Sequence, residues 1–271
     1  MSLTTTLSEN GRYDVVIERP PVNAFSIGLL RELTEALKSV PEQARVVVLR
    51  SEGQGFCGGG DVKEVQALPG FEGILGHGRY SLEVSAAIED CPVPVIAAVH
   101  RYCIGIGVLV VGVCDIVVAA EGTKFVLAEA DNGAASGVIQ ALGLLPEKRM
   151  RAVMFTCDAF TAEEMHRYGS VHAVTSPGDL VTCAQELADS IAAKRPLVIR
   201  ALKRSMNHSV SRDLVTKYRA ELSYTYELNM TGDARAARGT FVEGTRAGYV
   251  PSGDDGAGSG GFGGMGSAGA R

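Results

Sequence analysis

Two glycine-rich segments of the chain leave backbone N–H groups without side chains to cover them. In GFCGGGDVKE (55–64), the glycines at 58–60 follow a strand-like run, RVVVLRS, at 45–51. They also precede DVKEVQAL, a helix-like stretch at whose start N–H groups are unpaired and the helix dipole is positive. Such donors suit an oxyanion that develops during a reaction. A tight turn that simply requires glycine explains the same residues, so both interpretations stay open at this point.

Other glycine-rich sites fit this segment less well. A P-loop requires Gly-Lys-Ser/Thr, whereas Gly60 is followed by Asp-Val-Lys at 61–63. A dinucleotide-binding fingerprint, G-x-G-x-x-G, needs a different spacing. Cys57 as a nucleophile would need a nearby base that no motif supplies, so a buried structural cysteine is favoured.

The second glycine-rich segment favours the oxyanion interpretation over the bare turn. HRYCIGIGVLVVGVCD (100–115) also follows a strand-like run and opens an apolar stretch. Two turns of this kind, each placed after a core strand, can direct their N–H groups at one carbonyl oxygen. That is the arrangement of an oxyanion hole with two donors.

An alternation of strand-like and helix-like patterns predicts the elements that carry these turns. Helical patterns occupy 26–40 and 79–91, and 105–120 is predicted as helix followed by strand. This alternation favours an α/β fold with mostly parallel sheets covered by helices. Val/Ile-rich runs bounded by polar or glycine residues predict buried strands, and these runs lie at 13–18, 45–51, 93–100, 115–121, 124–129 and 171–176.

The pattern becomes mainly helical after about residue 146, which suggests a cap or an oligomer-forming region. We therefore expect a core over 1–195 and a helical C-terminal region over 196–250. The Gly/Ser-rich stretch 251–271 has the low complexity of a disordered tail.

Composition restricts the classes of function and the compartment. A formal net charge of −5 argues against a general nucleic-acid binder. Without an apolar leader or a run of about 18 apolar residues, neither a signal peptide nor a membrane span is expected. Six scattered cysteines fit reduced thiols and a cytoplasmic protein, and no His or Cys spacing predicts a metal site.

Several motifs together resemble the crotonase (enoyl-CoA hydratase/isomerase) superfamily. PPVNAFS, GFCGGGDVKEV, PVIAAVHRYCIGIG, CDIVVAAEGTKFVLAE and IAAKRPLVIRALKRSMN occur in that family's order, over about residues 12–246. The resemblance implies a crotonase spiral of ββα units with a helical C-terminal trimerisation region, assembled as a homotrimer or hexamer. It also implies acyl-CoA thioester substrates. Coenzyme A would then be part of the substrate, and no cofactor would be bound permanently.

The same resemblance implies a site in which the thioester enolate accepts hydrogen bonds from the N–H groups of Gly60 and Ile106. Glu129, in FVLAE, matches a family carboxylate, and its apolar neighbours should raise its pKa. The residues implied to line the CoA and substrate pocket are Gly58, Gly59, Asp61, Val62, Lys63 and Leu109. In this family, cations of a late helix such as RALKRSMN (200–207) approach CoA phosphates; the alternative is a solvent-facing turn.

One departure from the family pattern affects the expected reaction. The family's hydratases usually carry a second glutamate after the second glycine turn, and Leu109 stands at that place. Hydration of an alkene usually divides acid and base roles between two groups. Asp131 is a candidate second acid; the alternative is a loop or cap aspartate. This sequence is therefore less suited to simple alkene hydration than the sequences of the family's hydratases.

Three functions follow from these residues. The broad one is an acyl-CoA enzyme that stabilises a thioester enolate and shifts a double bond or adds water. The second is hydrolytic C–C ring opening of a cyclic β-keto acyl-CoA, since YTYELNMTG and SVHAVTS look similar to actinobacterial members that open steroid-derived rings. The third is a non-catalytic crotonase-like binding protein. Glu129 and both glycine turns favour an enzyme.

Overall fold

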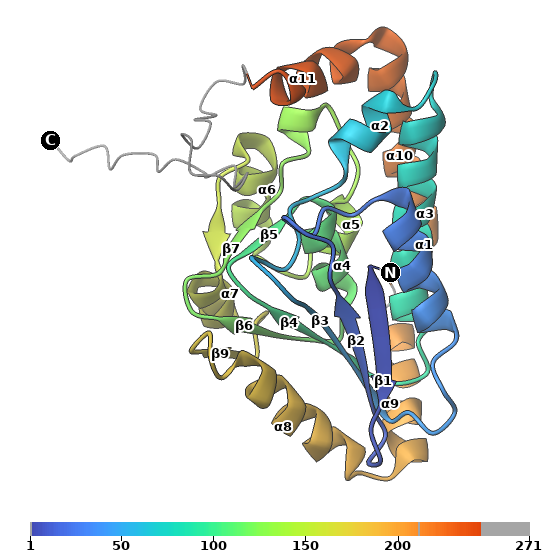
Figure 1. The fold of residues 1–271 in the computed structure, drawn as a ribbon, viewed down its shortest axis with the longest axis vertical. Coiled ribbons are helices and arrows are strands. Elements are labelled where there is room, and N and C mark those ends of the chain that lie inside the picture. The colour runs from blue at the N-terminus through green and yellow to red at the C-terminus, as the bar shows by residue number, and fades with distance from the viewer. Residues whose placement is uncertain (1, 211, 245–271) are drawn as a thin grey trace, which may run out of the picture.

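A six-stranded sheet forms the centre of the computed structural model, which describes residues 2–210 and 212–244 (Figure 1). Its first two strands are antiparallel and its other neighbours are parallel. In spatial order the strands are β1 (Leu3–Leu7), β2 (Arg12–Ile17), β3 (Val46–Ser51), β4 (Val95–Val99), β6 (Ile116–Ala120) and β9 (Ala173–Thr175). A smaller sheet contains β5 (Tyr102–Ile104), β7 (Lys124–Val126) and β8 (Phe160–Thr161).

The central strands β3, β4 and β6 are buried on both faces, which explains their continuous Val/Ile runs. On one face, Val46, Val48 and Ile96 pack with α8 (Leu180–Ala192). The alternate residues of the same strands, such as Val47 and Leu49, face a larger core. That core also contains residues of α1 (Ile27–Lys38), α3 (Glu72–Glu89) and α4 (Ile106–Val113), and Figure 1 shows α1 and α3 on the side of the sheet away from α8.

The other helices lie between the strands or follow the last one. The short helices are α2 (Val62–Ala67), α5 (Val138–Ala141), α6 (Glu147–Thr156) and α7 (Ala162–Tyr168), and the late ones are α9 (Pro196–Ser209), α10 (Leu214–Thr231) and α11 (Asp233–Val242). Helix α10 contacts α3 and α5, while α11 contacts α2 and the 3₁₀ turn Ala130–Asn132. The last helices thus return to the part of the fold that carries the glycine turns.

The predicted α/β fold with its helical C-terminal region is confirmed. One predicted strand, 124–129, is shorter than expected, because β7 ends at Val126 and Glu129 already caps the 3₁₀ turn. Strands β1, β5 and β8 and the short helix α5 were not predicted, whereas α11 lies within the helical region predicted over 196–250. The predicted tail 251–271 lies outside the described residues. Among the described helices, none combines the length and the apolarity that crossing a bilayer would require.

Lys203, in the basic segment 200–207, has a structural role that differs from both interpretations of that sequence, whereas Arg204 faces solvent. Lys203 is buried, and its Nζ donates to the carbonyls of Ile88 (3.0 Å) and Val93 (3.1 Å) and to Oδ2 of Asp115 (2.7 Å). Asp115 Oδ2 also accepts from the N–H of Val95 at 2.7 Å. Lys203 therefore neither faces solvent nor is free for a phosphate; it attaches α9 to the ends of α3 and β4.

Lys203→Met should lower the free energy of unfolding by about 3 kcal/mol, because it leaves one carboxylate and two carbonyls without their donor. We expect the lower end of the range for broken buried pairs, since the Asp115 side chain is 26% exposed. Chemical denaturation measures the change. Arg204→Met, at the exposed neighbouring position, is the control and should change stability by less than about 0.5 kcal/mol. Equal stability of the two variants would contradict this role.

Candidate active site

Three extended segments lie side by side and end at one edge. The segment before the first glycine turn pairs with β5, where Phe56 N–H donates to Tyr102 O (2.9 Å) and Ile104 N–H donates to Cys57 O (2.9 Å). Strand β5 in turn pairs in parallel with β7, with Ile104 opposite Val126. The residues that follow each segment are therefore neighbours, and they include Gly60, Ile106 and Glu129.

The first glycine turn is held by Phe25. Phe25 N–H donates to Gly59 O at 2.8 Å, and Phe25 O accepts from Asp61 N–H at 3.0 Å. Since C=O and N–H point in opposite directions in a trans peptide, the bond at Gly59 O directs the N–H of Gly60 away from Phe25. This N–H donates to no acceptor among the described residues.

The second glycine turn presents another unpaired donor. Gly105 has φ 49° and ψ −119°, a backbone conformation that favours glycine. Its N–H donates to Val126 O at 2.8 Å, which anchors the turn to β7. Ile106 is the first residue of α4, where N–H groups lack intrahelical acceptors, and its N–H has no acceptor in the described part of the chain.

Glu129 places a buried carboxyl group beside both turns. A Cβ atom built on Gly105 would lie 3.6 Å from Oε1 of Glu129 and 4.0 Å from Cα of Gly59. The Glu129 residue is only 8% exposed, and its Oε2 has no hydrogen-bond partner among the described residues. Burial raises the pKa of this carboxyl to about 7, in agreement with the direction expected from the sequence. Such a group exchanges protons readily near neutral pH.

Leu109 and Asp131 occupy different surroundings. Leu109 is buried on α4, and a Cβ atom on Gly137 would lie 2.7 Å from its Cδ1, so the two residues are in close contact. Asp131 is exposed on the 3₁₀ turn, and its backbone lies beside the Cys157 thiol. The structure thus buries Glu129 and leaves Asp131 at the surface. Its role as a second acid stays a prediction.

The residues predicted to line a CoA pocket surround the start of α2. Asp61 caps this helix through Oδ1, which accepts from Glu64 N–H at 3.0 Å, and its Oδ2 pairs with Arg19 at 2.8 Å. The aspartate therefore stabilises the turn itself. Lys63 is exposed and Val62 is partly buried, and Gly58 N–H donates to Val22 O at 2.8 Å.

His77 is a further neighbour of the first turn, and nothing in the sequence marks it as one. This residue lies on α3, and its Nε2 is 2.8 Å from Phe25 O. Burial lowers the pKa of its imidazole. No sequence motif connects His77 with Gly60, because their contact depends on how α3 packs in the folded chain.

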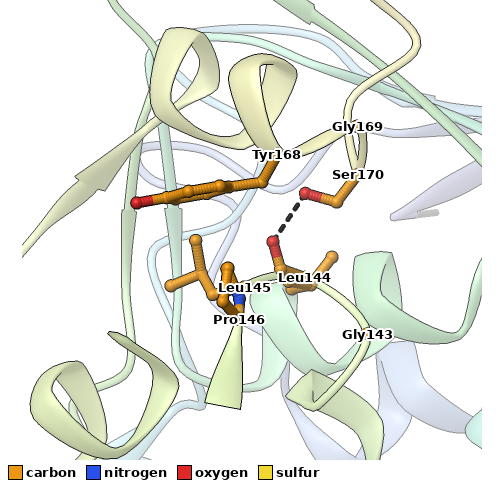
Figure 2. A pocket seen from close by; sticks show the side chains of 7 residues that line it. All are labelled: Gly143, Leu144, Leu145, Pro146, Tyr168, Gly169 and Ser170. Atoms are coloured by element: carbon orange, nitrogen blue, oxygen red, sulfur yellow. Dashed lines mark hydrogen bonds between the residues drawn. The ribbon is translucent and has the colours of Figure 1, made fainter. Parts of the chain in front are cut away.

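A separate surface pocket of about 270 Å³ lies away from these residues (Figure 2). Within it, the Ser170 hydroxyl donates a 2.5 Å hydrogen bond to Leu144 O. Its lining residues are Gly143, Leu144, Leu145, Pro146, Tyr168, Gly169 and Ser170, and none of the candidate site residues is among them. Across the described residues, no group of three or more His, Cys, Asp or Glu side chains could hold a metal ion.

Comparison with known sequences places the chain in a family. The family profile described as "Enoyl-CoA hydratase/isomerase" matches residues 8–250. The "(7aS)-7a-methyl-1,5-dioxo-2,3,5,6,7,7a-hexahydro-1H-indene-carboxyl-CoA hydrolase" of Rhodococcus jostii (strain RHA1) is 37% identical over 245 residues, which cover 90% of this chain and 95% of that protein. The protein of the same name in Mycobacterium tuberculosis is also 37% identical, with 90% and 99% covered. A short-chain-enoyl-CoA hydratase of Clostridium acetobutylicum is 28% identical, with 88% and 94% covered.

Solved structures show the same fold. An enoyl-CoA hydratase/isomerase from Xanthobacter autotrophicus Py2 superimposes with a TM-score of 0.81 at 22% identity, covering 90% of this chain and 94% of that one. An enoyl-CoA hydratase from Mycobacterium smegmatis gives 0.73 at 26% identity, with 91% and 98% covered. The fold, the profile and the relatives agree with the resemblance found in the motifs. The chain therefore belongs to the enoyl-CoA hydratase/isomerase family of the crotonase superfamily, and it is an acyl-CoA enzyme.

Proposed function

We propose that the protein hydrolyses a carbon–carbon bond in the ring of a cyclic β-keto acyl-CoA. The observation that carries this proposal is one buried carboxylate, Glu129, beside two backbone donors that have no acceptor among the described residues, with Leu109 in place of a second carboxylate. Two relatives at 37% identity bear the name of a hydrolase of a bicyclic dioxo carboxyl-CoA, which supports the same reaction class.

The proposed cycle needs one proton-transferring group. In its carboxylate form, Glu129 takes a proton from a water molecule that attacks the ring ketone. The bond between that carbon and the thioester α-carbon then breaks, and its electron pair forms the thioester enolate. Hydrogen bonds from Gly60 and Ile106 stabilise the enolate oxygen. The α-carbon finally takes the proton back from Glu129, so that one water molecule has been added across the broken bond.

A second candidate, double-bond isomerisation, also uses one carboxylate and the same enolate. Glu129 would remove a proton at one carbon and return it to another without adding water. Turnover of crotonyl-, cyclic enone- and β-diketone-CoA thioesters in ¹⁸O-labelled water separates the reactions. Hydrolysis places the label in a new carboxylate, whereas isomerisation leaves the product unlabelled.

We also propose that the exposed Lys63 contacts the phosphates of CoA, beside the backbone of Gly58 and Gly59. Its place at the start of α2, next to the first glycine turn, supports this contact. Asp61 and Val62 would contribute through the backbone of that turn, since the Asp61 carboxylate already pairs with Arg19.

Helix α9 supports the expected trimer or hexamer. Val198, Leu202 and Met206 follow one another at four-residue steps and are 50%, 53% and 66% exposed. Residues four apart share one face of a helix, so an isolated chain would present a continuous apolar stripe to water. Such stripes mark protein contacts, and we propose that this face of α9 lies in a subunit interface.

Glu129→Gln should lower kcat on the best thioester by about 10²–10⁴-fold, because the amide keeps the size of the side chain but transfers no proton. In the wild type, a base with a pKa of about 7 is active only when deprotonated. Its kcat/KM should therefore fall as pH drops through about 7 and level off above it. Asp131→Asn tests the surface carboxylate in parallel. Full activity in Glu129→Gln, or rapid hydration of crotonyl-CoA by the wild type, would rule out this mechanism.

Ile106→Pro should reduce kcat by about 10²-fold or more, because it removes one oxyanion donor. Proline is well tolerated at the first position of a helix, where the N–H has no partner to lose. Ile106→Val is the matched control, since valine is similar in size to proline and keeps the N–H. Steady-state kinetics of both folded variants decides the question; equal kcat values would exclude this donor.

Light scattering of the wild type should give the mass of a trimer or hexamer at micromolar concentration. Two charges in the apolar stripe, Leu202→Glu with Met206→Glu, should shift that mass toward a monomer because they would be buried unpaired in the interface. Val181→Glu is the control: Val181 is exposed on α8, outside the stripe, and its substitution should leave the mass unchanged. A monomeric wild type would contradict the proposed interface.

A further inference from the structure

We propose that His77 is a positioning residue, whose Nε2–H holds the Phe25 carbonyl and thereby keeps the N–H of Gly60 directed at the substrate oxygen. This inference rests on the proposed oxyanion hole. It assigns a task to a side chain on α3, a helix that carries none of the residues proposed for catalysis.

The two peptide groups on either side of Gly60 are both hydrogen-bonded to Phe25. Phe25 N–H binds Gly59 O at 2.8 Å and Phe25 O binds Asp61 N–H at 3.0 Å. A rotation of Gly60 that turned its N–H toward another direction would break at least one of these bonds. The orientation of this donor therefore depends on the position of Phe25.

The hydrogen bond to Phe25 fixes which ring nitrogen of His77 carries the proton. A carbonyl oxygen can only accept, so the 2.8 Å contact with Phe25 O requires that Nε2 carries the hydrogen. Burial lowers the pKa of the imidazole, and the neutral ring then has its lone pair on Nδ1. Phe25 O thus accepts two hydrogen bonds, one from Asp61 and one from His77.

His77 also fills the space beside Gly60. A Cβ atom built on Gly60 would lie 2.7 Å from Cε1 and 3.1 Å from Nε2 of His77. The imidazole therefore fills the place of a side chain at position 60 and lies against the glycine Cα. Helix α3 packs against α1 and α4, so the ring has a firm support. It limits movement of the turn toward α3.

These contacts distinguish His77 from an ordinary core histidine. His166 makes the same kind of bond, from Nδ1 to Val171 O at 2.9 Å, but it lies on α7. Both histidines bind a backbone carbonyl with a ring nitrogen, and the carbonyl bound by His77 belongs to the residue that fixes Gly60. His166 is therefore the matched control for loss of a histidine–carbonyl bond.

The test compares His77→Leu and His77→Gln with the same two substitutions at His166. Leucine removes the donor, and the glutamine amide can donate from nearly the position of Nε2. We expect His77→Leu to lower kcat by about 10- to 100-fold, less than the loss of a whole donor, with KM changed by less than about threefold. His77→Gln should recover most of kcat, and both His166 variants should keep it. Melting temperatures report on folding.

Several results would overturn the inference while leaving the proposed function intact. One is wild-type kcat in a folded His77→Leu variant, when Glu129→Gln and Ile106→Pro lose activity as expected. Another is a loss that His77→Gln does not recover. If Glu129→Gln and Ile106→Pro retain full activity, the proposed function itself fails. For the case in which His77→Leu does not fold, ¹⁵N NMR of the wild type gives the tautomer: protonated Nε2 supports the inference, and a neutral ring protonated at Nδ1 refutes it.

Discussion

Backbone N–H groups inside a folded protein almost always have an acceptor, and the proposed oxyanion hole needs two that do not. This constraint organises the site. Gly60 keeps an open N–H because Phe25 occupies the peptide groups on both sides of it. Ile106 keeps one because a helix begins there, directly after a glycine in a conformation other residues avoid. Neither donor is a side chain, so both depend on how the strands are paired.

The pairing of β5 with β7 connects these donors to the carboxylate. Because the strands are parallel and in register, the turn after β5 lies beside the residues after β7, and Glu129 arrives next to Gly105. Burying this carboxyl with Oε2 unpaired costs folding free energy. The same burial raises its pKa to about 7, where it can both take and return a proton. The apolar core on both faces of the large sheet offsets that cost.

The sequence was sufficient for features that depend on local pattern. Val/Ile runs located the buried strands, and the glycine turns with the FVLAE motif located Gly60, Ile106 and Glu129 as candidates. Strands β5 and β8 were missed because segments of two or three residues have no periodicity to detect. Lys203 was misjudged because the carboxylate and carbonyls it binds come from distant parts of the chain. Contacts made only by tertiary packing leave no such pattern in the sequence.

Leu109 stands at the position where the family's hydratases carry a glutamate. It makes an apolar contact that connects it to the C-terminal helices. Leu109 touches Gly137, whose N–H is bound by the Glu221 carboxylate of α10 at 2.9 Å; the same carboxylate binds Ile139 N–H at 2.9 Å. A shift of α10 would therefore move the loop that presses on Leu109. The N–H groups of Gly60 and Ile106 and the Glu129 carboxyl are instead positioned by the paired strands. The surroundings of Leu109 can thus change through α10 and this loop without a change in the strand pairs that hold the proposed donors and Glu129.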